Sequence, residues 1–291
     1  MDESPFDKLF TKSVPHILEK IFFSLDYASF TKYMEVNTAW RELLTSETFK
    51  RIGKFMFCED IEFNLWQALN VGNANEVREV LSSGMVNIEC TKMYKITPLF
   101  FAVESGFNDV VKLLLEEGAE PNCQTLSYVN GWTPLHLAAA KGNQEVAQLL
   151  LDGGANINME DGLGENIPLH RAGNQSMAKL LLDRGSYLNK QGEYGQTPLN
   201  CAAVDGLTDV VKFLLEKGAE PNRADKNGLT PLHNTSYYGN LLHRKDIVQL
   251  LIENGADLNM VSNSGHTPLR FALMTGRTEI ANLIRENGGT E

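Results

Sequence analysis

The stretch Gly131-Trp132-Thr133-Pro134-Leu135-His136-Leu137-Ala138-Ala139 decides the fold, because the chain repeats its central part. From proline to proline, successive copies lie 36, 34, 30, 33 and 37 residues apart. Self-similarity at a period near 33 residues indicates a repeat architecture, in which each copy is one structural unit. The copies of Thr-Pro-Leu, with one variant, begin at Thr97, Thr133, Ile167, Thr197, Thr230 and Thr267.

One copy predicts two short helices. The Thr133 hydroxyl can cap a helix N-terminus, and Pro134 suits the first helical position, where its missing N–H costs nothing. Gly142 is expected to end this first helix, and a second apolar helix is expected over 145–151. Neither helix can bury its apolar surface alone, so the copies are predicted to stack on one another as a solenoid.

The period and the recurring tetrapeptide resemble the ankyrin repeat. The resemblance covers 61–291 and implies an all-α solenoid of about seven repeats, joined by short β-turn or hairpin loops. The first repeat lacks its Thr-Pro-Leu, as is usual for a repeat that closes a stack. The expected repeats are 61–91, 92–127, 128–161, 162–191, 192–224, 225–261 and 262–291.

Two of these repeats are irregular. The fourth is three residues short between Leu169 and Leu180, and Ile167 replaces the capping threonine. A lost cap costs about 1 kcal/mol, so the fourth repeat is expected to be the weak link of the array. The sixth repeat has gained four residues around 240–245.

The N-terminal part differs from the repeats. Residues 1–12 are expected to form an arm, and 13–60 are expected to form three short helices. The pattern Val14-Pro15-x-Ile17-Leu18-x-x-Ile21-Phe22-x-x-Leu25-Asp26, followed by Phe30, Val36 and Trp40-Arg41, is similar to an F-box. The resemblance implies docking to a Skp-type adaptor, and through it to a cullin–RING ubiquitin ligase. The adaptor-binding residues that it implies are Pro15, Ile17, Leu18, Ile21, Leu25, Phe30, Val36 and Trp40.

An alternative is that this segment only caps the end of the repeat stack. Twenty of the residues in 13–52 are apolar or proline, more than a unit this small can bury on one internal face. Apolar surface left over on a soluble protein usually marks a partner site, which favours the F-box interpretation.

Charge and composition narrow the partners. The net charge is −11, of which −9 lies in 61–291. Because nucleic-acid affinity depends on Lys and Arg neutralising phosphates, such binding is not expected, whereas a basic or mixed protein partner is. No run approaches the ~20 apolar residues of a membrane span, and the N-terminus lacks a secretory pattern. The four cysteines are scattered, which favours reduced thiols in a cytoplasmic or nuclear protein.

Catalytic and metal-binding patterns are missing from the sequence. His136, His170 and His233 occupy one repeat position a full repeat apart, and we expect them to be structural hydrogen-bonding residues. Gly288-Gly289 is read as the stop of the last helix. The chain is therefore expected to be neither an enzyme nor a cofactor-binding protein.

A binding surface is implied by the resemblance, since ankyrin-like proteins line a concave face with their turn tips and first helices. The positions just before each Thr and just before the closing Gly are expected to face it, although about half of them are equally well read as solvated turn residues. Aromatic residues gather there, and Trp and Tyr are frequent interface hot spots. The candidate substrate-binding residues are Tyr94, Glu104, Trp132, Lys141, Tyr194, Asp205, Leu229, Tyr237, Tyr238 and Met274.

Three hypotheses follow for the function. The first is a substrate-recognition subunit of an SCF-type ubiquitin ligase, in which catalysis by proximity is supplied from elsewhere. The second is a non-catalytic protein-interaction scaffold with a helical N-terminal cap. The third, an enzyme hidden in the loops, is disfavoured because catalytic groups are missing from the sequence.

Overall fold

The computed structural model describes residues 58–84, 86–92, 95–126, 131–162, 165–192, 194–237 and 244–291. The chain divides into two compact units, one of residues 1–67 with 79–87 and one of residues 68–78 with 88–291. The predicted F-box, apart from 58–60, and its eight adaptor-binding residues lie outside the described residues. Tyr94 and Tyr238 of the predicted substrate face also lie outside them.

The regular elements across these ranges are helices in pairs. The first pair is α6 (Cys58–Val71) and α7 (Ala74–Ser82), through both of which the boundary between the units runs. Six pairs follow: α8 (Pro98–Ser105) with α9 (Asn108–Glu116), α10 (Pro134–Lys141) with α11 (Gln144–Asp152), η2 (Pro168–Arg171) with α12 (Gln175–Asp183), α13 (Pro198–Asp205) with α14 (Thr208–Glu216), α15 (Pro231–Tyr237) with α16 (Arg244–Glu253), and α17 (Pro268–Met274) with α18 (Thr278–Glu286).

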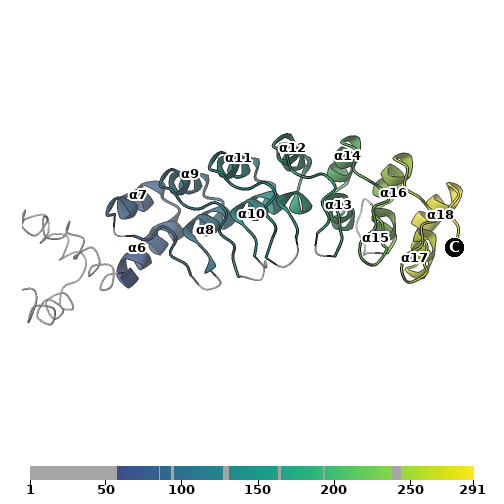
Figure 1. The fold of residues 1–291 in the computed structure, drawn as a ribbon, viewed down its shortest axis with the longest axis horizontal. Coiled ribbons are helices and arrows are strands. Elements are labelled where there is room, and N and C mark those ends of the chain that lie inside the picture. Colours follow the sequence, from purple (N-terminus) through teal and green to yellow (C-terminus); the bar gives the residue numbers. More distant parts are fainter. Residues whose placement is uncertain are drawn as a thin grey trace, which may run out of the picture. The chain divides into compact units, whose positions relative to one another are not determined.

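The helices of the second unit form two layers. The first helices of the pairs lie side by side in one row and the second helices in another, each contacting its neighbours along the row (Figure 1). The apolar core lies between the rows: Leu135, Val146 and Leu150 are fully buried, as are their counterparts in other repeats. The all-helical solenoid predicted from the sequence is thereby confirmed for the described repeats.

The helix ends follow the expected chemistry. Thr133 is extended, and its Oγ1 accepts a hydrogen bond from the His136 N–H at 3.4 Å. The same bond, from the N–H three residues further along the chain, is accepted at 3.2 Å by Thr97, Thr197 and Thr267. Gly142 ends α10 in the left-handed region, at φ 65°. Each Thr-Pro-Leu is thus a helix start whose cap satisfies an otherwise unpaired N–H.

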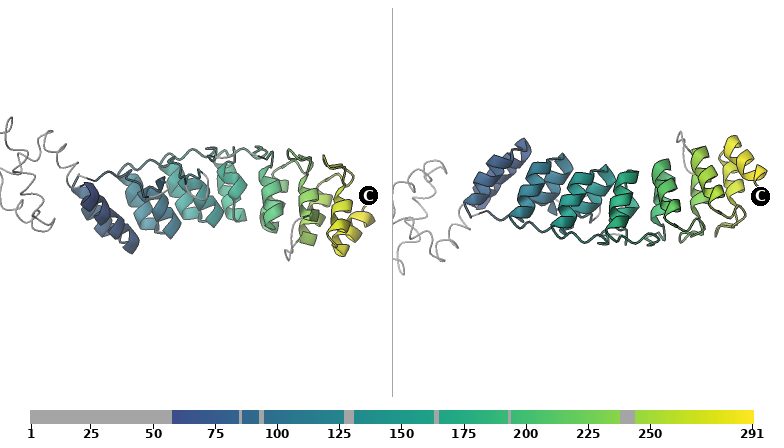
Figure 2. Two further views of the ribbon diagram at one scale, coloured as in Figure 1. Left: turned by 90° about the horizontal axis from the view of Figure 1, so that it is seen from below. Right: turned by 90° about the horizontal axis from the view of Figure 1, so that it is seen from above.

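The connections between repeats run along one edge of the helical layers (Figure 2). Backbone bonds join their described ends, such as Asp161 N–H to Asn166 O at 2.9 Å and Asp225 N–H to Leu229 O at 2.9 Å. Neighbouring tips also touch, since the Gly162 N–H donates to Gly131 O at 3.2 Å. These turns carry the residues that precede each Thr-Pro-Leu, so stacking fixes where those residues lie.

A series of asparagines fastens several of the repeats to the next one. Asn122 Oδ1 accepts the Asn156 N–H at 2.7 Å, and its Nδ2 donates to Gly154 O at 3.3 Å. Asn158, Asn222 and Asn259 repeat this double bond to the following repeat. Because one side chain satisfies a donor and an acceptor of its neighbour, the series fixes the register of stacking.

The fourth repeat has lost most of its first helix. In place of an eight-residue α-helix it has the four-residue 3₁₀ helix η2, and Ile167 offers no side-chain cap. His170 Nδ1 accepts the Ile167 N–H at 3.1 Å, as His136 Nδ1 does from Thr133, and the uncapped His170 N–H donates to Ile167 O at 2.9 Å. The Gly173 N–H then donates to Ala139 O of the third repeat at 2.9 Å. The shortened turn is therefore tied to the preceding repeat.

The sixth repeat has a polar core. Asn234, Thr235 and Ser236 are fully buried at positions where the third repeat has Leu137-Ala138-Ala139. The two hydroxyls donate to carbonyls of the preceding turn, at 2.7 and 2.8 Å, whereas neither polar atom of the Asn234 amide has a hydrogen-bond partner. Buried Arg244 donates to Thr235 O at 3.1 Å, at the carboxyl end of α15, where a cation is favourable.

Candidate functional site

Trp132 and Arg171 form the centre of the predicted binding surface. The Arg171 guanidinium lies over the Trp132 ring, 5.2 Å from its centroid, and its Nη2 is 3.9 Å from Asp161 Oδ2. The half-buried Trp132 ring also stacks on His136, with centroids 6.4 Å apart. A partly exposed indole that is held by a cation from the next repeat is a rigid, amphipathic contact surface.

Arg171 was missed by reasoning from the sequence. It occupies the position at which other repeats have Phe101, Leu137, Cys201 and Phe271. A single cation in an otherwise mostly apolar series was the signal that could have found it. Its side chain is 37% exposed, so its guanidinium reaches the surface beside Trp132.

Asp205 lies at the end of α13, on the other side of Arg171 from the third repeat. Loss of solvent around the carboxyl raises the pKa of Asp205, while the charge of Arg171 acts in the opposite direction. Asp161 and Asp205 therefore both interact with Arg171, and these two carboxylates and one guanidinium form a central charged group. Its net charge favours a cationic or mixed partner over an acidic one.

Lys141 and Glu104 lie on adjacent first helices, as expected, but they do not form an ion pair. Lys141 Nζ donates to the backbone carbonyl of Glu104 at 2.7 Å. This bond anchors the lysine near the carboxyl end of α8, where the helix dipole favours a cation. The Glu104 side chain is half-buried, so it offers the surface only part of its carboxylate.

A second aromatic group lies in the last two repeats. Tyr237 meets Phe271 edge to face, with centroids 5.2 Å apart, and Phe271 also contacts His266 at 5.3 Å. Tyr237 is 44% exposed and Met274, at the end of α17, is 57% exposed. Leu229 is half-buried in the preceding turn. The predicted residues therefore fall into a central and a C-terminal group.

Tyr194 belongs to neither of these groups. It lies in the turn before α13 with 60% of its surface exposed, and its carbonyl accepts the Lys226 N–H of the next turn at 2.8 Å. Its backbone thus takes part in stacking while its side chain is left to solvent.

The three repeat-position histidines are structural, as expected. His136 is fully buried; its Nε2 bonds to Asn166 O at 2.9 Å, and its Nδ1 lies 2.8 Å from Thr133 Oγ1. His170 and His233 reach the next repeat in the same way. Burial lowers the pKa of His136 to about 4. Among the described residues, no group of three or more His, Cys, Asp or Glu could hold a metal ion.

Cys90, Cys123 and Cys201 carry free thiols, and burial raises the pKa of Cys201 to about 12, which makes its thiolate scarce.

Within the described part of the chain, no helix is both long enough and apolar enough to cross a membrane.

Comparison with known proteins gives consistent matches to the repeats. A family model of ankyrin repeats matches three times, over residues 65–161, 160–225 and 220–291. The structure resembles the human ASB11 ankyrin repeat domain with a TM-score of 0.68 and 26% identity, covering 78% of this chain and 98% of that one.

Two curated relatives match a shorter segment. They are the "Ankyrin repeat, SAM and basic leucine zipper domain-containing protein 1" of Saimiri boliviensis boliviensis and of Ateles geoffroyi, each 32% identical over 75 residues. That segment is 26% of this chain and 15% of each relative, so it compares the repeats and not the whole proteins. The family models together span the repeats from residue 65 to residue 291, and the chain belongs to the ankyrin-repeat family.

Proposed function

We propose that this chain is the non-catalytic substrate receptor of an SCF-type ubiquitin ligase, acting in the cytoplasm or nucleus. In this proposal the segment 13–60 docks a Skp-type adaptor, and the ankyrin repeats bind a protein substrate. The surrounding ligase supplies the chemistry, and the receptor contributes by holding the substrate nearby.

The observation that carries the protein-binding part is the Trp132–Arg171 pair. Stacking of repeats does not require a tryptophan in that turn or an arginine at position 171, since the other repeats stack without them. Trp, Tyr and Arg are the residue types enriched at binding hot spots, each contributing about 2 kcal/mol or more when well buried. Tyr237 and Tyr194 are further exposed aromatic residues of the predicted substrate face.

The adaptor part is supported by the residue pattern from Val14 to Arg41 alone. Its test is co-purification of a Skp-type adaptor with the full chain. A Pro15→Ala, Leu18→Ala variant should lose the adaptor while the helical circular dichroism of the repeats is unchanged. Undiminished adaptor recovery by this variant would rule out the F-box assignment and leave the protein-interaction scaffold as the function.

The substrate surface has a separate test. A Trp132→Ala, Tyr237→Ala variant should retain the adaptor but lose partners in a proximity-labelling comparison with the parent chain. Tyr187→Ala is the control, because Tyr187 is an exposed aromatic residue, at 60%, but follows the second helix of its repeat. If the labelled partners of the double variant equal those of the parent, this surface is not the recognition site.

A further inference from the structure

Three first helices in the C-terminal half of the array carry apolar side chains at one repeat position. Counted from the proline that starts each helix, the seventh residue is Val204 in the fifth repeat, Tyr237 in the sixth and Met274 in the seventh. Tyr237 is 44% exposed, Met274 is 57% exposed and Val204 is half-buried. The fourth repeat has no counterpart, because η2 ends after four residues. These three residues, which we call the apolar row, therefore span consecutive repeats.

The sixth and seventh repeats form an apolar patch at their end of the row. The Tyr237 ring meets Phe271 edge to face, with centroids 5.2 Å apart, and Phe271 lies one helical turn before Met274. Methionine is unbranched and flexible, so its side chain adapts to the shape of an incoming apolar group. The patch thus suits apolar side chains of a partner.

Backbone carbonyls of the row are already bonded within the chain. Arg244 Nη2 donates to Val204 O at 3.3 Å, and Arg277 Nη2 donates to Tyr237 O at 3.0 Å. Each arginine belongs to the repeat that follows, so the ends of α13 and α15 are held by their neighbours. Carbonyls at a helix end otherwise need a partner from outside the helix. The row therefore offers side chains in fixed positions, which lowers the entropy cost of binding.

A carboxylate lies at the fifth-repeat end of the row. Asp205 follows Val204 directly and is exposed. Among the described residues, its carboxylate makes neither a hydrogen bond nor an ion pair, and Arg171 acts on it only through its charge. The net charge over 61–291 is −9. A basic group of a partner is therefore favoured at this end of the row.

The spacing of the repeats selects the conformation of a partner segment. Packed helices lie about 8–10 Å apart, so the row offers one contact at each such step. A polyproline II chain has three residues per turn and rises about 3.1 Å per residue, so every third side chain lies on one face, about 9 Å from the last. In a β-strand, side chains three residues apart point to opposite faces. In an α-helix, three residues advance only about 4.5 Å.

We propose that the apolar row and Asp205 bind a polyproline II segment of the protein substrate, in which one basic and two apolar residues are spaced three apart. The basic residue lies at Asp205, and the two apolar residues lie at Tyr237 and Met274. The inference rests on the proposed function, since it names the kind of segment that the repeats bind.

The first test uses the full chain and synthetic peptides. The peptide Lys-Gln-Pro-Leu-Gln-Pro-Leu should shift the methyl resonance of Met274 in methionine-labelled protein. It is tested in both sequence orders, because the row does not fix the direction of the bound chain. The isomer Lys-Gln-Leu-Pro-Leu-Gln-Pro should bind at least about fivefold more weakly, since only one of its leucines can then reach the row. Equal binding of the isomer, or no shift with either order of the first peptide, would overturn the proposal.

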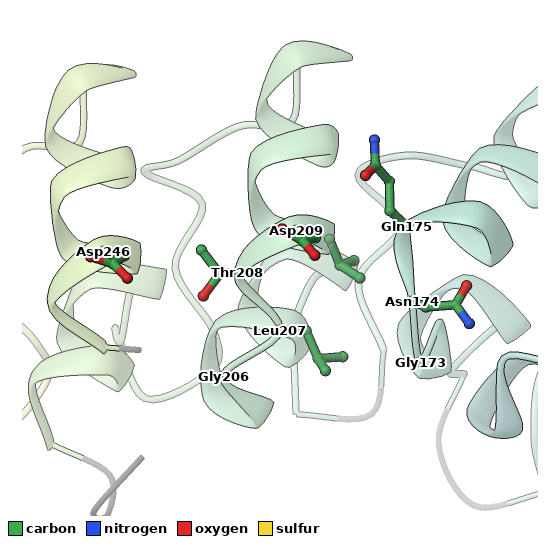
Figure 3. Close-up of a pocket in the computed structure, with 9 residues that line it drawn as sticks. Gly173, Asn174, Gln175, Gly206, Leu207, Thr208, Asp209 and Asp246 are labelled. Carbon is green, nitrogen blue, oxygen red and sulfur yellow. The ribbon is translucent and has the colours of Figure 1, made fainter. Parts of the chain in front are cut away.

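The charge of Asp205 has its own test. Asp205→Asn should weaken binding of the lysine peptide about two- to fivefold, the range of a partly exposed ion pair, and should leave binding of the same peptide with norleucine for lysine unchanged. Asp209→Asn is the control, because Figure 3 shows Asp209 in the first turn of α14, a second helix of the array. Equal weakening by the two variants, or none by Asp205→Asn, would contradict the proposed register.

Proximity labelling separates this inference from the proposed function. Met274→Ser should retain the adaptor but label partners at least about fivefold less than the parent, as expected when an apolar contact is lost. If Met274→Ser labels like the parent while Trp132→Ala, Tyr237→Ala loses partners, the row proposal fails alone. If both label like the parent, the substrate surface in the proposed function fails as well. A dimer of the parent that Met274→Ser dissociates in sedimentation, without any peptide response, would overturn the proposal and assign the row to a second copy of the chain.

Discussion

At the scale of single residues, a buried histidine in one repeat holds the turn of the next. His136, His170 and His233 each reach a carbonyl of the following turn, and Asn200 does the same in the fifth repeat through its Nδ2, 3.4 Å from Arg223 O. In the last repeat the position is Arg270, whose Nη1 lies 3.5 Å from a Glu291 carboxylate oxygen. In the third to sixth repeats the role is therefore hydrogen bonding to the next repeat, and His or Asn fulfils it.

The first prediction concerns acid sensitivity. Burial lowers the pKa of His136 and of His170 from 6.5 to about 4, so between these values the unfolded chain binds more protons than the folded chain. Stability contributed by the neutral imidazoles is full above pH 6.5 and is lost as the pH falls toward 4. Each of these two pKa shifts corresponds to about 3 kcal/mol of folding stability at most.

The measurement is urea unfolding between pH 7 and pH 4.5. His136→Asn, which copies the residue of the fifth repeat, should lower the free energy of unfolding at pH 7 but weaken its decline toward acid. A pH dependence equal to that of the parent would show that His136 does not titrate on unfolding.

The second prediction concerns two glycines at turn tips. Gly131 and Gly265 both have φ near +75°, at 75° and 79°, so an alanine is strained at either position. A Cβ on Gly131 would collide with the backbone of Gly162, whereas a Cβ on Gly265 meets nothing within 4 Å. Gly265→Ala should cost roughly 1–2 kcal/mol from backbone strain, and Gly131→Ala clearly more. Thermal unfolding of the two variants measures both losses of stability. Equal losses would mean that the turns of Gly131 and Gly162 can move apart without a cost in free energy.

At the scale of elements, first helices that look equivalent in sequence differ in structure. Positions 137 and 234 correspond, yet one side chain is leucine in an apolar layer and the other is an asparagine whose buried amide has no partner. The arginines at the carboxyl end of α15 satisfy carbonyls there but not the Asn234 amide. The sixth repeat therefore contains an unfavourable buried group.

The third prediction follows from that group. An unsatisfied buried amide costs about 1–3 kcal/mol, so Asn234→Leu should raise the free energy of unfolding by a comparable amount. Asn200→Leu is the control, because the Asn200 amide bonds to Arg223 O and its loss should destabilise. Chemical denaturation measures both; destabilisation by Asn234→Leu would indicate that the amide has a function in the folded chain.

At the scale of the whole molecule, stability is close to a sum of repeat and nearest-neighbour contributions. The fourth repeat contributes least from its first helix, since η2 has four residues where α10 has eight. Its neighbours are joined through it, because η2 contacts both α10 and α13.

The fourth prediction is that amide hydrogen exchange is fastest in the fourth repeat among the internal repeats. Its residues should exchange at least about tenfold faster than the equivalent amides of the third and fifth repeats, a difference of about 1.4 kcal/mol in local opening. Native-state exchange followed by mass spectrometry measures this. Uniform protection along the array would show that the bonds of Gly173 and Asn174 to the third repeat replace the missing turn in full.

The sequence by itself determined the repeats, their helix starts and the aromatic residue in the third turn. These follow from local chemistry, since a Thr-Pro-Leu start and a left-handed glycine act within a few residues of themselves. The sequence also showed that the fourth repeat is three residues short.

Only the tertiary structure decided how the shortened fourth repeat packs and which residue lies beside Trp132. The deletion could have been taken up on either side, and the bonds of Gly173 and Asn174 show that the shortened turn is tied to the third repeat. Arg171 lies beside Trp132 because the two repeats stack, although the residues are 39 positions apart in sequence. Contacts between repeats depend on how whole units pack, and no local pattern of residues contains that information.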